Sequence, residues 1–216
     1  MGNLPKAEEF HLKSLKIYEN LFGENHSYVA TSYNSLGNLY YNMGNLPRAE
    51  EFYLKSLKIF ENLFGENHSD VATSYNNLGV LYKNMGNLPK AEEFYLKSLK
   101  IYENLFGENH SNVATSYNNL GSLYYNMGNL PKAEEFYLKS LKIRQNLFGE
   151  NHSDVAMSYY NLSVFYSQSI KKPNASINYA KKSYEIILRL FGKSNPKTVQ
   201  YFNNYNNILV SLNQLE

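Results

Sequence analysis

A 42-residue repeat is the feature that most restricts how this chain can fold. The string Met-Gly-Asn-Leu-Pro begins at four positions that are separated by this interval: Met1, Met43, Met85 and Met127. Residues 43–84 and 85–126 differ at only five of their 42 positions. Repeats of about 20–50 residues are typical of solenoids, propellers and related arrays. The chain is therefore predicted to stack copies of one structural unit.

Each repeat contains two helical patterns. Between Pro47 and Phe64, apolar residues recur three and four positions apart, as on one side of an amphipathic helix. A similar pattern runs over residues 69–84. Proline opens the first pattern and Gly65 follows it, as at helix starts and C-caps. The residues predicted to cap the second helices are Ser27, Ser69, Ser111 and Ser153. No segment shows strand alternation, so the unit is predicted to be a helix–turn–helix of an all-α protein.

The composition excludes several classes of protein. The chain has 21 Lys and Arg and 19 Asp and Glu, a formal net charge of +2, which is too balanced for binding nucleic acid or a membrane surface by charge alone. It has no Cys, which excludes disulfides and thiolate metal sites. No apolar run is long enough to span a membrane, and no signal peptide follows Met1. We therefore expect a soluble cytoplasmic protein whose partner is not a membrane, and the balanced charge disfavours a nucleic-acid partner.

The pattern within the repeat resembles the tetratricopeptide repeat family. The matching small and large residues, in the family's order, are Leu78-Gly79, Tyr82, Gly86, Leu88, Ala91, Tyr95 and Ser98-Leu99. That family usually has a period of about 34 residues. The longer period here, with Gly-Glu-Asn-His-Ser-Asp-Val-Ala before Asn-Asn-Leu, is similar to the repeats of kinesin light chains. The resemblance covers the whole chain and implies a right-handed α-solenoid, or superhelix, of antiparallel helix pairs with about ten helices.

The repeat borders predict a single domain over residues 1–216. It begins with a lone second (B) helix at 1–23 that lacks its first (A) helix, and it ends with a terminal capping helix at 196–216. The helix pairs are expected at 27–65, 69–107, 111–149 and 153–192. Residues 171–174 shift the register of the fourth pair by one. The uncapped first helix indicates either a longer array or an edge covered by another chain, so a homo-oligomer through this helix stays open.

Differences between repeats concentrate in particular columns of the A helices. These columns lie 7, 10 and 13 residues after the first, along one side of a helix. Because A helices line the concave surface in the resembled family, these residues are expected to face a peptide-binding groove. The candidate peptide-binding residues are Asn34, Asn38, Tyr41, Asn76, Asn77, Lys83, Asn118, Asn119, Tyr125, Asn161 and Asn204.

Asparagine suits a groove that holds an extended peptide. Its amide has two donors and an acceptor, so it can pair with a backbone N–H and C=O together. The resemblance to kinesin light chains implies an asparagine ladder formed by Asn77, Asn119, Asn161 and Asn204, from which Ser35 departs. A solvated face explains these residues equally well, because the chain is rich in Asn even in its loops. The function predicted is a non-catalytic scaffold that binds a partner peptide or helix.

Catalytic, metal and cofactor sites are not expected. One His per repeat without Cys does not supply zinc ligands, so loop packing or capping is expected of His26, His68, His110 and His152. A clamp for acidic C-termini would need Lys and Arg where this chain has Thr31 and Asn34. Two alternatives stay open. One is a self-assembling or accessory repeat module of a larger multidomain protein. The other is a reader of single-stranded RNA, which the balanced charge disfavours.

Overall fold

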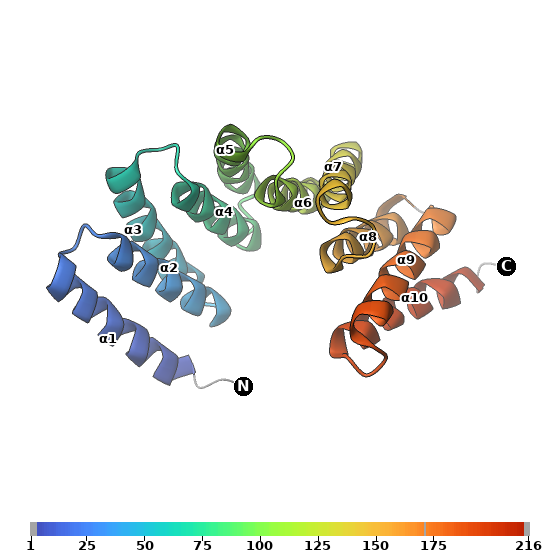
Figure 1. The fold of residues 1–216 in the computed structure, drawn as a ribbon, viewed down its shortest axis with the longest axis horizontal. Coiled ribbons are helices and arrows are strands. Elements are labelled where there is room, and N and C mark those ends of the chain that lie inside the picture. The colour runs from blue at the N-terminus through green and yellow to red at the C-terminus, as the bar shows by residue number, and fades with distance from the viewer. Residues whose placement is uncertain (1–3, 171, 214–216) are drawn as a thin grey trace. The chain divides into compact units, whose positions relative to one another are not determined.

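The computed structural model describes residues 4–170 and 172–213, which form ten α-helices and one π-helix, with no strand among them (Figure 1). The helices are α1 (Leu4–Phe22), α2 (Ser27–Asn42), α3 (Leu46–Phe64), α4 (Ser69–Asn84), α5 (Leu88–Phe106), α6 (Ser111–Asn126), α7 (Leu130–Phe148), α8 (Ser153–Phe165), η1 (Tyr166–Ile170), α9 (Pro173–Phe191) and α10 (Pro196–Asn213).

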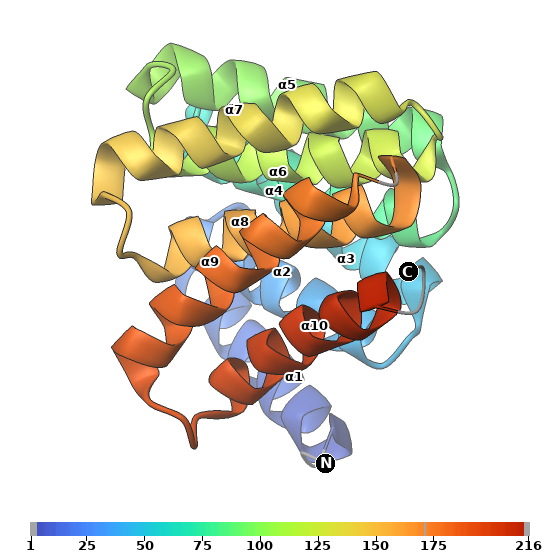
Figure 2. The ribbon, with the colours of Figure 1, turned by 90° about the vertical axis from the view of Figure 1, so that its right-hand side faces the viewer.

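The chain divides into two compact units, residues 1–107 and 108–216. Unit 1 contains α1 to α5, and unit 2 contains α6 to α10 with η1. In unit 1, α2 packs on α3 and α4 on α5, while α1 contacts α2 and α3 contacts α4. In unit 2, α6 packs on α7 and α8 on α9, and α10 lies along α9 (Figure 2). We call the even-numbered helices A helices and the odd-numbered ones B helices. The predicted all-α fold of helix pairs is confirmed.

Buried apolar side chains that recur in every repeat hold the pairs together. In the A helices of unit 1 the fully buried members are Val29, Ala30, Leu36, Val71, Ala72, Leu78 and Leu81. A close approach within the second pair brings the ring of Tyr95 onto Gly79, where an added Cβ would lie only 2.6 Å from a ring carbon. Because close-packed interiors leave no such room, the B-helix tyrosine requires a glycine on the A helix.

Histidines, not the predicted serines, cap the A helices. The Nδ1 atom of His68 accepts the backbone N–H of Asp70 at 3.2 Å, and Ser69 is already the first helical residue. The same bond occurs in the other repeats, at His26, His110 and His152. The imidazole reaches the N–H two residues ahead, so it satisfies a donor that a helix start leaves unpaired. The prediction of serine caps is wrong, and capping by the loop histidines is confirmed.

The fourth helix pair is displaced in sequence by one residue. The B helices end at Phe64, Phe106 and Phe148, 42 residues apart, but α9 ends at Phe191, 43 residues after α7. Helix α8 continues into the π-helix η1, whose wider turn accommodates an additional residue. Lys171, in the segment predicted to contain the shift, lies outside the described residues.

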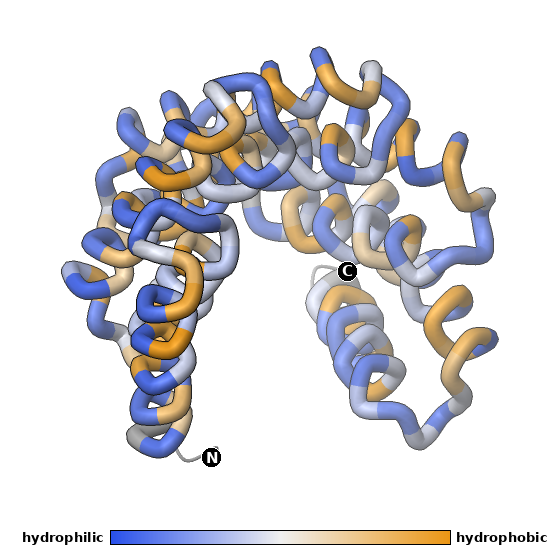
Figure 3. Tube along the Cα trace, turned by 60° about the vertical axis from the view of Figure 1, so that its left-hand side comes forward, coloured by the Kyte–Doolittle hydropathy of each residue, from blue (hydrophilic) through white to orange (hydrophobic). Residues whose placement is uncertain are grey.

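Hydrophobic and hydrophilic residues alternate along the helices (Figure 3). This is the pattern of helices that pack on one face and meet water on another. No helix in the described part of the chain is long and apolar enough to cross a membrane.

Candidate functional site

The A helices of unit 1 bring the predicted asparagines together. Asn77 on α4 donates its side-chain N–H to the amide oxygen of Asn34 on α2 at 2.9 Å. Both side chains are half-buried. The bond holds the two amides in one orientation. Asn76, the neighbour of Asn77, is also half-buried. We call this surface of α2 and α4 the A-helix face of unit 1.

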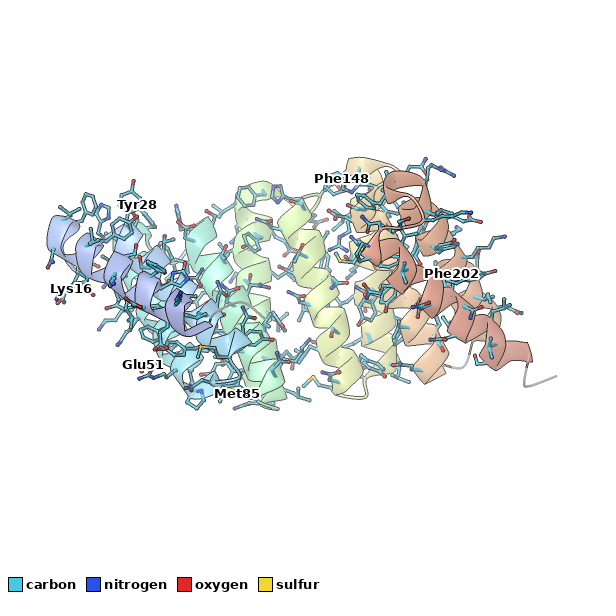
Figure 4. The ribbon with its side chains drawn as sticks, turned by 90° about the horizontal axis from the view of Figure 1, so that it is seen from below. Lys16, Tyr28, Glu51, Met85, Phe148 and Phe202 are labelled. Carbon is cyan, nitrogen blue, oxygen red and sulfur yellow. The ribbon has the colours of Figure 1, made fainter. Side chains whose placement is uncertain are left out.

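A second set of polar contacts lies further along the same two helices. The amide of Asn84 donates to the hydroxyl of Tyr41, which is half-buried. The exposed Asn38 accepts a hydrogen bond from the buried hydroxyl of Tyr53 at 2.7 Å. Two of the predicted residues, Asn38 and Tyr41, therefore have their side chains held in place. Figure 4 shows Tyr28 and Met85 near opposite edges of this unit.

Lys83 is the cation among the predicted residues. It lies near the end of α4 and is half-buried, and burial lowers the pKa of its ammonium group. A partly desolvated ammonium favours an anionic or strongly polar partner more than a solvated one does.

Unit 2 repeats this arrangement with different side chains. Asn161 on α8 donates to the amide oxygen of Asn118 on α6 at 2.7 Å. Asn204 on α10 donates to the hydroxyl of Ser163 at 2.9 Å. The hydroxyl of Tyr125 donates to Gln168 at 3.1 Å. Asn119 is half-buried on α6.

The A-helix face of unit 2 contains a cavity of about 270 Å³ between α6 and α8. Its lining is uncharged and rich in rings: Ser122, Tyr125, Asn126, Tyr137, Tyr160, Asn161, Val164 and Phe165. The buried ring of Phe165 stands edge-on to Tyr125, with centroids 6.2 Å apart, and lies 5.6 Å from Tyr137. Burial raises the pKa of Tyr137 to about 12. The cavity can accept a ring or a short apolar chain and offers hydroxyl and amide groups at its rim.

Three residues at or beside this cavity were not among the predicted site residues. Gln168, in the π-helix η1, accepts a hydrogen bond from Tyr125 at the same 43-residue spacing at which Asn84 meets Tyr41. Tyr160 stands where α4 has Asn76, and Phe165 where it has Leu81, so the fourth repeat adds two rings to the wall. The signal in the sequence is this pair of aromatic substitutions, which is confined to one repeat.

Another cavity, of about 340 Å³, lies away from the A-helix face of unit 1, where Tyr75 of α4 meets α5. Lys97, which lines it, pairs with Glu93 at 2.7 Å, and Tyr75 donates to Glu61 at 2.7 Å. Lys97 is therefore held by Glu93, and Glu66 and Lys100 also line this cavity. Among the described residues, no group of three or more His, Cys, Asp or Glu side chains could hold a metal ion.

Comparisons with known proteins agree with the fold of helix pairs. The family model described as tetratricopeptide repeat matches residues 1–62, 28–104, 70–125 and 112–189. No curated protein sequence matches the chain.

Several solved structures share the fold. BtubC (BKLC) from P. vanneervenii has a TM-score of 0.84 and 25% identity, with 99% of this chain and 85% of that chain covered. A Podosopora anserina protein described as a kinesin light chain with nearly identical repeats has a TM-score of 0.71 and 18% identity, with 88% and 90% covered. The apo form of RapI has a TM-score of 0.73 and 18% identity, with 97% and 78% covered.

Proposed function

Because the chain belongs to the tetratricopeptide repeat family, we propose that it is a non-catalytic scaffold that binds an extended peptide of a partner protein on its A-helix faces. The observation that supports this most is the pairing of asparagines between successive A helices, Asn77 with Asn34 and Asn161 with Asn118. Each pair holds an amide in one orientation before any ligand arrives. Preorganised groups lower the ordering cost of binding.

The uncharged cavity of unit 2 supplies a second element of recognition in this proposal. An extended peptide whose backbone pairs with Asn161 would place one side chain beside Tyr125 and Tyr160. Rigid aromatic walls contribute contact area at low entropic cost. A charged side chain would lose solvation there without meeting an opposite charge in the lining.

The first step is a pull-down, in which the immobilised full chain retains the proteins that bind it. Overlapping peptides of a retained protein then identify the segment that is bound. Asn161→Ala is then expected to weaken that peptide by about 1–3 kcal/mol, because it removes a ligand contact and releases Asn118. Asn146→Ala is the matched control, since this exposed asparagine lies on the B helix α7.

The peptide-binding proposal fails if Asn161→Ala and Asn77→Ala both leave the affinity unchanged. It also fails if the control variant weakens binding as much as they do.

A further inference from the structure

The cavity of unit 2 is lined by aromatic rings from three helices. The rings belong to Tyr125 of α6, Tyr137 of α7 and both Tyr160 and Phe165 of α8. Tyr137 and Phe165 are buried, whereas Tyr125 and Tyr160 are half-buried. The two half-buried tyrosines, on successive A helices, are therefore the rings that a ligand in this cavity can reach most easily.

Both of these tyrosines are held by contacts within unit 2. The hydroxyl of Tyr125 donates to Gln168 at 3.1 Å. The ring of Tyr160 packs against that of Tyr201 on α10, with centroids 4.7 Å apart, and Tyr201 is itself buried. Aromatic side chains that are already fixed lose little conformational entropy when a ligand binds. The two walls are thus arranged in advance for a compact apolar group.

The two rings of α8 are particular to the fourth repeat. In the A helices α2, α4 and α6, asparagine stands in place of Tyr160 and leucine in place of Phe165; these residues are Asn34, Asn76, Asn118, Leu39, Leu81 and Leu123. Those helices form the same kind of helix pair without the two rings. Packing of the repeat therefore does not require Tyr160 and Phe165, and a ligand-binding role explains why they occur together beside one cavity.

The lining combines its rings with hydrogen-bond donors and carries no charge. The amides of Asn126 and Asn161 and the hydroxyl of Tyr160 all line the cavity. A carboxamide has two N–H donors and a phenol has one O–H donor. A charged group would lose its solvation there without meeting an opposite charge. The group that fits best is apolar, compact and flanked by carbonyl oxygens that can accept hydrogen bonds.

Proline has this combination of properties. Its pyrrolidine ring is apolar, and the residue has no backbone N–H that would need an acceptor. A segment in the polyproline II conformation has no internal hydrogen bonds, so its carbonyl oxygens are available to donors. Grooves lined by aromatic rings recur among proteins that bind such preformed segments. A phenylalanine could contact the same rings, but its flexible segment would have to be ordered on binding.

We propose that the cavity of unit 2 binds a proline residue of a partner segment in the polyproline II conformation, with the pyrrolidine ring against Tyr125 and Tyr160. This inference rests on the proposed function, because it names the class of residue that the A-helix face of unit 2 selects.

The test uses the full chain and a fluorescein-labelled oligoproline peptide. Fluorescence anisotropy is expected to show saturable binding, which a Gly-Ser peptide of equal length should not show. Tyr160→Asn and Phe165→Leu restore the residues of the other repeats, so circular dichroism should find both variants folded. Each should weaken oligoproline binding about tenfold, because one ring contact is lost. Tyr28→Asp is the matched control that should leave binding unchanged, since this exposed tyrosine lies in unit 1 and its equivalents include Asp70.

Three results would overturn the proline site. The first is the absence of saturable binding by oligoproline, and the second is equal binding by the wild type and Tyr160→Asn. The third is tighter binding of a Gly-Ser peptide that contains one phenylalanine, because that result assigns the cavity to an aromatic side chain. If oligoproline fails while the segment found by pull-down still loses affinity in Asn161→Ala, the peptide-binding function stands and only the proline site is wrong.

Discussion

Asn77 donates its side-chain amide to the oxygen of Asn34, 2.9 Å away on the preceding A helix. The two residues are 43 positions apart, so the bond joins neighbouring repeats across their A-helix face. It therefore contributes to repeat stacking as well as to the arrangement of groups that a ligand would meet.

This bond predicts a measurable coupling between the two asparagines. In a double-mutant cycle with Asn77→Ala and Asn34→Ala, the free energy of unfolding should show a coupling of about 0.5–1.5 kcal/mol, as for a partly exposed hydrogen bond between neutral groups. Urea denaturation measures it. The pair Asn77→Ala and Asn104→Ala, which are on different faces, should be additive. Additivity in the first cycle would show that the bond does not contribute to stability.

Gly79 and Tyr95 should also be coupled, through a steric fit and not through a hydrogen bond. Gly79→Ser is expected to destabilise unit 1 by about 1–3 kcal/mol, because its Cβ would lie 2.6 Å from the Tyr95 ring. At the equivalent positions α8 and α9 have Ser163 and Ala180, both fully buried. The double variant Gly79→Ser, Tyr95→Ala should therefore unfold with a smaller loss than the sum of the single losses.

Thermal and urea unfolding of the four proteins in this cycle measure that difference. If the two single losses add up to the loss of the double variant, the steric conflict between a serine at position 79 and the ring of Tyr95 does not exist.

The helix pairs, their period and the buried glycine–tyrosine positions followed from the sequence, because packing constrains the same columns in every copy. The details of the site did not follow so directly. The partner of Asn77 is Asn34, one residue before the equivalent position, Ser35, and the repeat period alone does not reveal this. Gln168 meets Tyr125 at the same spacing at which Asn84 meets Tyr41, but the sequence does not reveal that a π-helix carries Gln168.

The histidine caps predict a specific response to substitution. His68→Ala should destabilise the protein by about 0.5–2 kcal/mol, because the N–H of Asp70 loses its acceptor. His68→Asn should recover much of this, since asparagine is an effective N-cap, but not the stacking of His68 on Phe64 at 4.2 Å between centroids. Urea midpoints compare the variants, with His11→Ala as a histidine control that caps no helix. Equal losses for Ala and Asn would show that stacking, not capping, is the contribution of His68.

Buried tyrosines predict loss of stability at high pH. Burial raises the pKa of Tyr53 from 10.0 to about 12, and burial does the same for Tyr201 in the other unit. Because the folded state keeps these protons longer than the unfolded chain, stability should be constant below pH 10 and fall between about pH 10 and 12. The midpoint of urea denaturation, measured as a function of pH, tests this, and the absorbance of phenolate reports the ionisation of the tyrosines. In the Tyr53→Phe variant, the midpoint should fall less steeply with pH. Midpoints that stay constant up to pH 12 would contradict the prediction.

Arg144 gives the last prediction, because it is a buried charge whose hydrogen-bond acceptors are neutral groups. It is 4% exposed on α7 and donates to the hydroxyl of Ser158 at 2.9 Å and the carbonyl of Asp154 at 3.4 Å. Burial lowers the pKa of its guanidinium group. The equivalent residues of α5 and α9 are Tyr102 and Ile187, so the site accommodates an uncharged side chain.

Replacing a buried charge by a well-packed uncharged residue is often neutral or stabilising, so Arg144→Tyr should leave the free energy of unfolding unchanged or raise it by about 1 kcal/mol. Ser158→Ala should cost about 1–3 kcal/mol while Arg144 is present, since the guanidinium loses a partner, and much less in the Arg144→Tyr background. Chemical denaturation of the four proteins separates these cases. A large loss for Arg144→Tyr alone would mean that the guanidinium is itself a stabilising contact between α7 and α8.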